Sequence, residues 1–163
     1  MFIVKRFLRI LRTTSPLAAL LICAACGDSF LEPVLEPGLV LDPEVESFVE
    51  QMNAYRQTVG CAPLYWNMSV AEVALGHSRD MIERNFFAHT NPDGATPFDR
   101  MTAAGISFSR AAENIANGYP TATAVLTAWL NSPGHRNNIE NCTLTEHGVG
   151  LQGTHWTHLF RTP

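Results

Sequence analysis

The sequence predicts an α+β domain in which helices come first and a two-stranded hairpin closes the chain. Apolar residues recur at helical spacing through residues 44–58, 70–82 and 121–130. In residues 145–152 and 155–160 they instead alternate with glycine or polar residues, which is typical of strands. Helices followed by a terminal sheet indicate a layered domain of about 120 residues.

The first 25 residues resemble a lipoprotein signal peptide. Four basic residues precede Leu17–Ala25, an apolar run of nine that is too short to span a bilayer. The run ends in Ala-Ala-Cys-Gly, which is similar to a bacterial lipobox and predicts a lipid on Cys26. Because Gly27 rather than Asp follows the cysteine, we expect anchoring in the cell envelope, at the outer membrane if the cell has one. The alternative is plain secretion after cleavage near Ala25.

The charge of the mature chain argues against two classes of partner. Removing residues 1–25 leaves seven arginines, no lysine and fifteen acidic residues, a formal charge of −8. Neither nucleic acid nor an anionic lipid surface is expected to be a main partner of such a chain.

Two cysteines remain beyond the leader and Cys26, namely Cys61 and Cys142. In an exported chain the simplest expectation for such a pair is a disulfide, with two buried free thiols as the alternative. Such a bridge would close a loop of about eighty residues, and chain-entropy reasoning predicts that it stabilises the fold by roughly 4 kcal/mol.

Residues 26–43 carry three prolines and several acids, and they predict a semi-extended tether ahead of a domain at 44–163. Asp42 and Pro43 are expected to start the first helix, which Gly60 ends. Ser69 is the predicted N-cap of the next helix, with Glu72 completing a capping box.

The later elements follow from turn residues and apolar runs. A short helix is expected at 96–104, a buried segment or strand at 110–116, and a helix start at Ser132 and Pro133. Gly153 lies at the predicted hairpin turn. His77 is expected in a helix core, and His147 half exposed on a strand.

Three residues in different segments are candidates for one site: His89, Glu113 and His135. Imidazole and carboxylate are ligands that Zn²⁺ accepts, and three protein ligands leave one position open. Their spacings of 24 and 22 residues are far too long for a local metal motif, so the residues alone point only weakly to zinc.

A family resemblance strengthens this hypothesis. The ordered runs HSRDM, FFAHTNPDGATPFDRM, AAENIA, AWLNSPGHRNNI, TEHGVGL and HWTHLF resemble the bacterial branch of the CAP superfamily, which includes cysteine-rich secretory proteins, antigen 5 and pathogenesis-related 1 proteins. The resemblance covers residues 44–162. It implies a three-layer α-β-α sandwich of the CAP, or SCP, type.

The resemblance also implies a cavity lined by two histidines and two acids. His89, Glu113 and His135 fall on three of these positions, and Ser132 stands where the second glutamate is expected. The serine removes one charge and one strong acceptor, so a zinc site would have three ligands. Glu146 is a candidate replacement acid.

Three functions are then open. The first is a non-catalytic extracytoplasmic binding module for a metal, a lipid-like ligand or a protein partner. The second is a metal-dependent hydrolase in which zinc held by the three residues activates a water; it lacks an obvious general base. The third is a surface interaction module with a vestigial cavity. We expect binding rather than catalysis.

Overall fold

The computed structural model describes residues 41–163 of the chain. The predicted signal peptide, Cys26 and most of the tether 26–43 lie outside the described residues, and these predictions stay predictions. No helix within residues 41–163 is long and apolar enough to cross a membrane.

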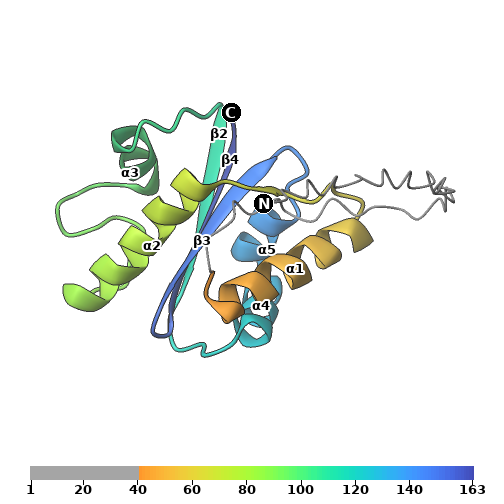
Figure 1. The fold of residues 1–163 in the computed structure, drawn as a ribbon, viewed down its shortest axis with the longest axis horizontal. Coiled ribbons are helices and arrows are strands. Elements are labelled where there is room, and N and C mark those ends of the chain that lie inside the picture. Colours follow the sequence, from red (N-terminus) through yellow and green to blue (C-terminus); the bar gives the residue numbers. More distant parts are fainter. Residues whose placement is uncertain (1–40) are drawn as a thin grey trace, which may run out of the picture. The chain divides into compact units, whose positions relative to one another are not determined.

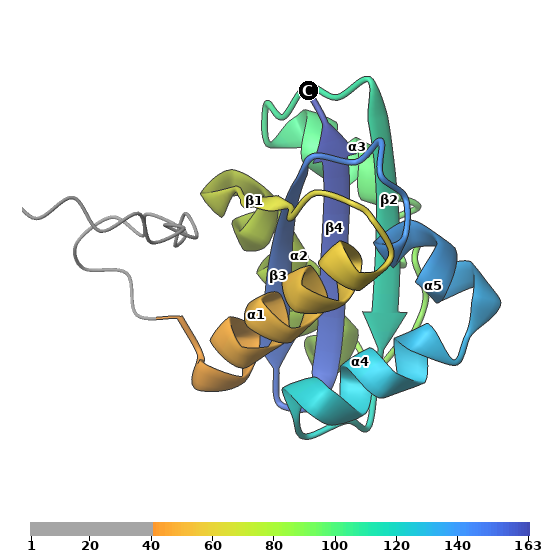
Figure 2. The same cartoon turned by 90° about the vertical axis from the view of Figure 1, so that its right-hand side faces the viewer.

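A four-stranded sheet lies between two layers of helices (Figure 1). Helices α2 and α3 cover one face, and α1, α4 and α5 lie on the other side (Figures 1 and 2). This arrangement confirms the three-layer sandwich that the resemblance implies. The helices are α1 Pro43–Thr58, α2 Met68–Glu83, α3 Pro97–Ala103, α4 Ala122–Leu130 and α5 Pro133–Ile139.

The sheet has the strand order β1-β3-β4-β2. Its long strands β3, β4 and β2 are antiparallel, whereas the short β1 joins β3 in parallel. The predicted hairpin is confirmed, with Gly153 at its turn in the left-handed region at φ 60°. The strands are β1 Tyr65–Trp66, β2 Arg110–Ala116, β3 Glu146–Gln152 and β4 His155–Thr162.

Two glycines of β3 let α2 lie directly on the sheet. A Cβ atom on Gly148 would be 2.1 Å from the backbone nitrogen of Ala71, and one on Gly150 would be 2.1 Å from that of Leu75. Any other residue would push the helix away. Glycine therefore alternates in this strand because α2 packs against one face of it, in addition to the ordinary strand periodicity.

The main core lies between the sheet and the layer of α1 and α4. It is built on aromatic residues: the rings of Phe48 and Trp129 meet edge to face with centroids 5.4 Å apart, and Trp156 lies 5.9 Å from Phe48. The predicted disulfide between Cys61 and Cys142 is present and ties the end of α1 to the segment after α5. It closes the long loop that the sequence analysis expects.

Two local expectations are wrong. Asn67, not Ser69, is the N-cap of α2, because its side chain accepts a hydrogen bond from the Val70 amide at 3.1 Å. The preceding β1 pairing delivers Asn67 to that position, which no local pattern reveals. His147 is fully buried rather than half exposed.

Candidate functional site

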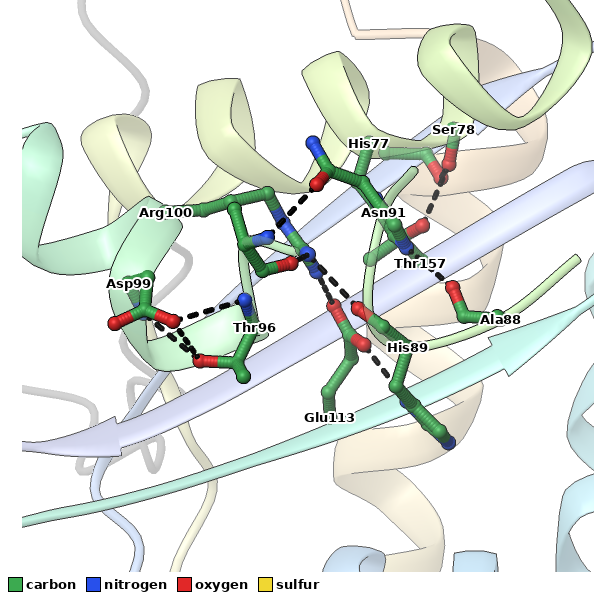
Figure 3. A network of polar contacts seen from close by, with 12 residues as sticks. His77, Ser78, Ala88, His89, Asn91, Thr96, Asp99, Arg100, Glu113 and Thr157 are labelled. Atoms are coloured by element: carbon green, nitrogen blue, oxygen red, sulfur yellow. Dashed lines mark hydrogen bonds and ion pairs between the residues drawn. The ribbon is translucent and has the colours of Figure 1, made fainter. Parts of the chain in front are cut away.

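Glu113 is the centre of the candidate site. It lies in the middle of β2 with only 2% of its side chain exposed, and both carboxylate oxygens are engaged. His89 Nδ1 lies 2.7 Å from one oxygen, and Arg100 Nη2 donates to the other at 2.6 Å (Figure 3). The structure thus brings together two of the three predicted residues and adds a cation.

The contact with Glu113 determines which ring nitrogen of His89 carries the proton. A carboxylate only accepts hydrogen bonds, so Nδ1 must carry the proton, and in the neutral ring Nε2 is then an acceptor. The His89 side chain is 51% exposed, which leaves Nε2 accessible to a ligand. In the neutral ring, Nε2 of His89 can therefore accept a hydrogen bond from a ligand.

Arg100 organises the loop that carries His89. Its Nη1 donates to the carbonyl oxygens of His89 at 2.8 Å and of Ala95 at 3.1 Å. Arg100 lies in α3, one position after Asp99, which forms the capping box with Thr96 that begins this helix. The sequence patterns did not point to Arg100; the available signal was an arginine directly after an acid near a predicted helix start.

His77 supports the same loop from α2. It is fully buried, as expected, and its Nε2 donates to the carbonyl oxygen of Ala88 at 3.0 Å. Burial, and after it the nearby Arg100 charge, lowers the pKa of His77. A neutral His77 therefore holds the residue that precedes His89.

His135 belongs to a different part of the site. Successive side chains of a strand point to opposite faces, so Glu113 reaches α3 whereas Asn114 reaches α5. Asn114 donates to the carbonyl oxygen of His135 at 3.0 Å and accepts from the side chain of Asn138 at 2.8 Å. These two bonds tie β2 to α5.

A cavity of about 290 Å³ lies beside His135. Burial, and then the charge of His89, lowers the pKa of the His135 imidazole. Ser132 is the N-cap residue of α5 but makes no side-chain capping bond, and it faces this cavity. Most of the wall is apolar, with a few polar groups among it: Phe87, Ile115, Tyr119, Trp129, Asn117, Ser132 and His135.

The residues as arranged do not fit a three-ligand zinc centre. Among residues 41–163, no three side chains of His, Cys, Asp or Glu converge as metal ligands. Glu113 already binds a cation and an imidazole N–H, and a metal would have to displace one of them. Glu146 does not compensate, because its Oε2 accepts from Arg161 and Asn67 at 2.8 Å each. Zinc binding stays a prediction.

Two further histidines form a pair inside the core. His147 Nδ1 and His158 Nε2 are 3.0 Å apart, and both residues are fully buried. Burial, and then the charge of Arg56, lowers the pKa of His147 to about 3. Burial, His147 and Arg56 together lower the pKa of His158 well below its usual value. These residues belong to the core and not to the site.

Comparisons with known proteins agree with the fold and the motifs. The model of the cysteine-rich secretory protein family, CAP, matches residues 49–156. The uncharacterized protein YkwD of Bacillus subtilis (strain 168) is 44% identical over 114 residues, which are 69% of this chain and 44% of that protein. The uncharacterized membrane protein YlbC of the same organism is 37% identical over 115 residues, which are 71% of this chain and 33% of that protein.

One solved structure is similar to this chain in both fold and sequence. An extracellular protein containing a SCP domain from Bacillus anthracis str. Ames superposes with a TM-score of 0.72 at 33% identity. The match covers 77% of this chain and 45% of that chain. The present chain therefore spans less than half the length of these relatives.

Proposed function

The chain belongs to the cysteine-rich secretory protein (CAP) family, and from that premise we propose that it is an exported, non-catalytic binding domain. Its ligand is a small molecule with an apolar body and one polar group, held in the cavity beside His135. The observation that carries the proposal is the wall of this cavity, where aromatic and aliphatic side chains surround a few polar ones.

The electrostatics of the site support binding rather than catalysis. Glu113 is engaged on both oxygens, by Arg100 and by His89, so it is not free to take a proton from a water. Ser132 supplies no second acid. A neutral His135 imidazole at the cavity wall can still donate or accept one hydrogen bond to a polar group of the ligand.

Export is supported by three independent observations. The leader has the features of a signal peptide, and Cys26 follows it in a lipobox-like run. The Cys61–Cys142 disulfide is typical of proteins outside the cytoplasm. The Bacillus anthracis relative is described as extracellular. Labelling with palmitate tests the anchor: we expect label on the parent chain and none on Cys26→Ala.

A cavity-filling variant tests the ligand class. The probe is anilinonaphthalene sulfonate, an anionic aromatic dye, with decanoic acid as its competitor. Ala128→Phe places a ring in the cavity from α4, and Thr127→Phe adds the same ring on the exposed side of that helix. We expect at least fivefold weaker dye binding for Ala128→Phe and His135→Ala and unchanged binding for Thr127→Phe. Equal binding by Ala128→Phe and the parent would contradict the proposal.

The zinc hypothesis has its own test. Calorimetric titration with Zn²⁺ is made on the parent, on His89→Ala and on His135→Ala. One-to-one binding that both substitutions abolish would make a metal the ligand and replace the proposal of an organic molecule. Metal-dependent turnover of peptide or ester substrates that Glu113→Ala abolishes would likewise establish the hydrolase.

A further inference from the structure

The β3 edge of the sheet is covered over only part of its length. β1 pairs with Glu146 and His147 at the start of β3, and the chain then leaves the edge at Asn67 to begin α2. In the part of the chain that the structure describes, the rest of β3 has a neighbouring strand only on its other side, where β4 lies. Figure 2 shows this edge next to α1 and the short β1.

Four main-chain groups face this uncovered edge. Asn67 donates its backbone N–H to the carbonyl oxygen of His147 at 2.8 Å, so His147 directs its main chain toward the edge. Because the direction alternates along a strand, the N–H and C=O groups of Val149 and Leu151 point the same way. Residues 41–163 give these four groups no hydrogen-bond partner.

A groove of about 310 Å³ runs along the same edge. Trp66 contributes a buried indole Nε1–H that has no partner among residues 41–163, and buried polar groups of this kind normally have one. Most of the other walls are apolar, and the residues that matter here are Leu41, Val45, Trp66, Met68, Val149 and Leu151. The groove thus combines apolar walls with unpaired main-chain groups, which is what an added strand requires.

The N-terminal end of the described chain lies in the wall of this groove. Leu41, the first described residue, lines the groove together with Asp42. The residues directly before it, 33–40, read PVLEPGLV and are largely apolar. Prolines are tolerated on an edge strand, where their missing N–H faces away from the sheet. A segment joined directly to the groove also has a local concentration in the millimolar range.

We propose that residues 33–40 of the same chain dock in this groove and add a strand to the edge of β3 at Val149 and Leu151. The docked segment satisfies the edge main-chain groups, and its apolar side chains cover the partly exposed Trp66 and Leu151. Docking also shortens the tether. Residues 26–42 reach at most about 58 Å, whereas residues 26–32 alone reach at most about 24 Å. Docking therefore sets how far the domain stands from an anchor at Cys26.

Amide hydrogen exchange of the full mature chain tests this proposal. The variant is Leu39→Asp with Val40→Asp, which places two charges on the docking segment outside the described fold. We expect the amides of Val149 and Leu151 to exchange at least tenfold faster in the variant, and the Trp66 indole signal to shift. The Gly148 amide points to β4 and serves as the internal control. Leu31→Asp is the matched charge outside the segment and should change nothing.

Two outcomes would overturn the proposal. Equal exchange at Val149 and Leu151 in the parent and the variant would mean that residues 33–40 do not cover the edge. Protection that disappears on dilution of the parent would mean that a second copy of the chain covers it instead.

Discussion

Histidine has two different environments in this fold: a contact with an acid at the surface, and a contact with a second histidine in the core. His89 lies at the surface against the Glu113 carboxylate, with Arg100 on the other oxygen. His147 and His158 lie in the core against each other; among the described residues no carboxylate bonds to either ring, and Arg56 is a nearby charge. The first arrangement tolerates charge, and the second requires neutral rings. Partners and burial, not residue type, decide the role.

Burial is the main reason why the core pair stays neutral, and the charge of Arg56 adds to it. Its guanidinium is fully buried and donates to the carbonyl oxygens of Ala62, Ile139, Asn141 and Leu144. Neutral carbonyls stabilise this cation without cancelling its charge, so its field acts on the neighbouring imidazoles. At the site, by contrast, Glu113 directly opposes the charge of Arg100.

The largest expected effect comes from removing the acid of the site. Glu113→Ala leaves Arg100, whose side chain is only 12% exposed, with carbonyl partners and no carboxylate, and breaking a largely buried pair in this way costs about 3–5 kcal/mol. Urea unfolding at pH 7 measures the loss. Glu113→Gln keeps the shape and one acceptor and should lose clearly less. A loss below about 1 kcal/mol for Glu113→Ala would mean that the pair is solvated like an ordinary surface ion pair.

Lowering the pH should destabilise the folded protein through the buried pair His147 and His158. The pKa of His147 falls from 6.5 to about 3 on folding, so between these values the unfolded chain binds more protons than the folded one. Stability is therefore complete above pH 6.5 and falls as the pH drops toward 3. For His147 alone this loss is on the order of 4 kcal/mol. Urea unfolding at successive pH values measures it. His147→Phe should flatten this dependence, and an unchanged slope would assign it to other groups.

The smallest expected effect concerns the two histidines near the cavity. The charge of His89 is the lesser of two causes that lower the pKa of His135, after burial. His89→Gln should therefore raise the pKa of His135, but only part of the way to the usual value. A proton NMR titration of the His135 ring measures this shift. No shift would mean that the two rings are too far apart to share a ligand.

The sequence predicted most of the secondary structure because the local signals were strong. Helical periodicity and caps such as Asp42 depend on neighbours within four residues. The start of α2 was misplaced because Asn67 is positioned by the pairing of β1 with β3, whose paired residues are 81 positions apart, as in Tyr65 and Glu146. Only long-range pairing could supply that information.

The candidate site also has features that the sequence predicted and features that depend on long-range contacts. By itself the sequence determined most of the elements, the disulfide partners and, through ordered motifs, the family. Only the tertiary structure decided that Arg100 shares Glu113 with His89, that Asn114 bonds the main chain of His135, and that His147 is buried. The physical reason is that charge pairing and burial depend on which strands and helices meet, and those contacts join residues far apart in the chain.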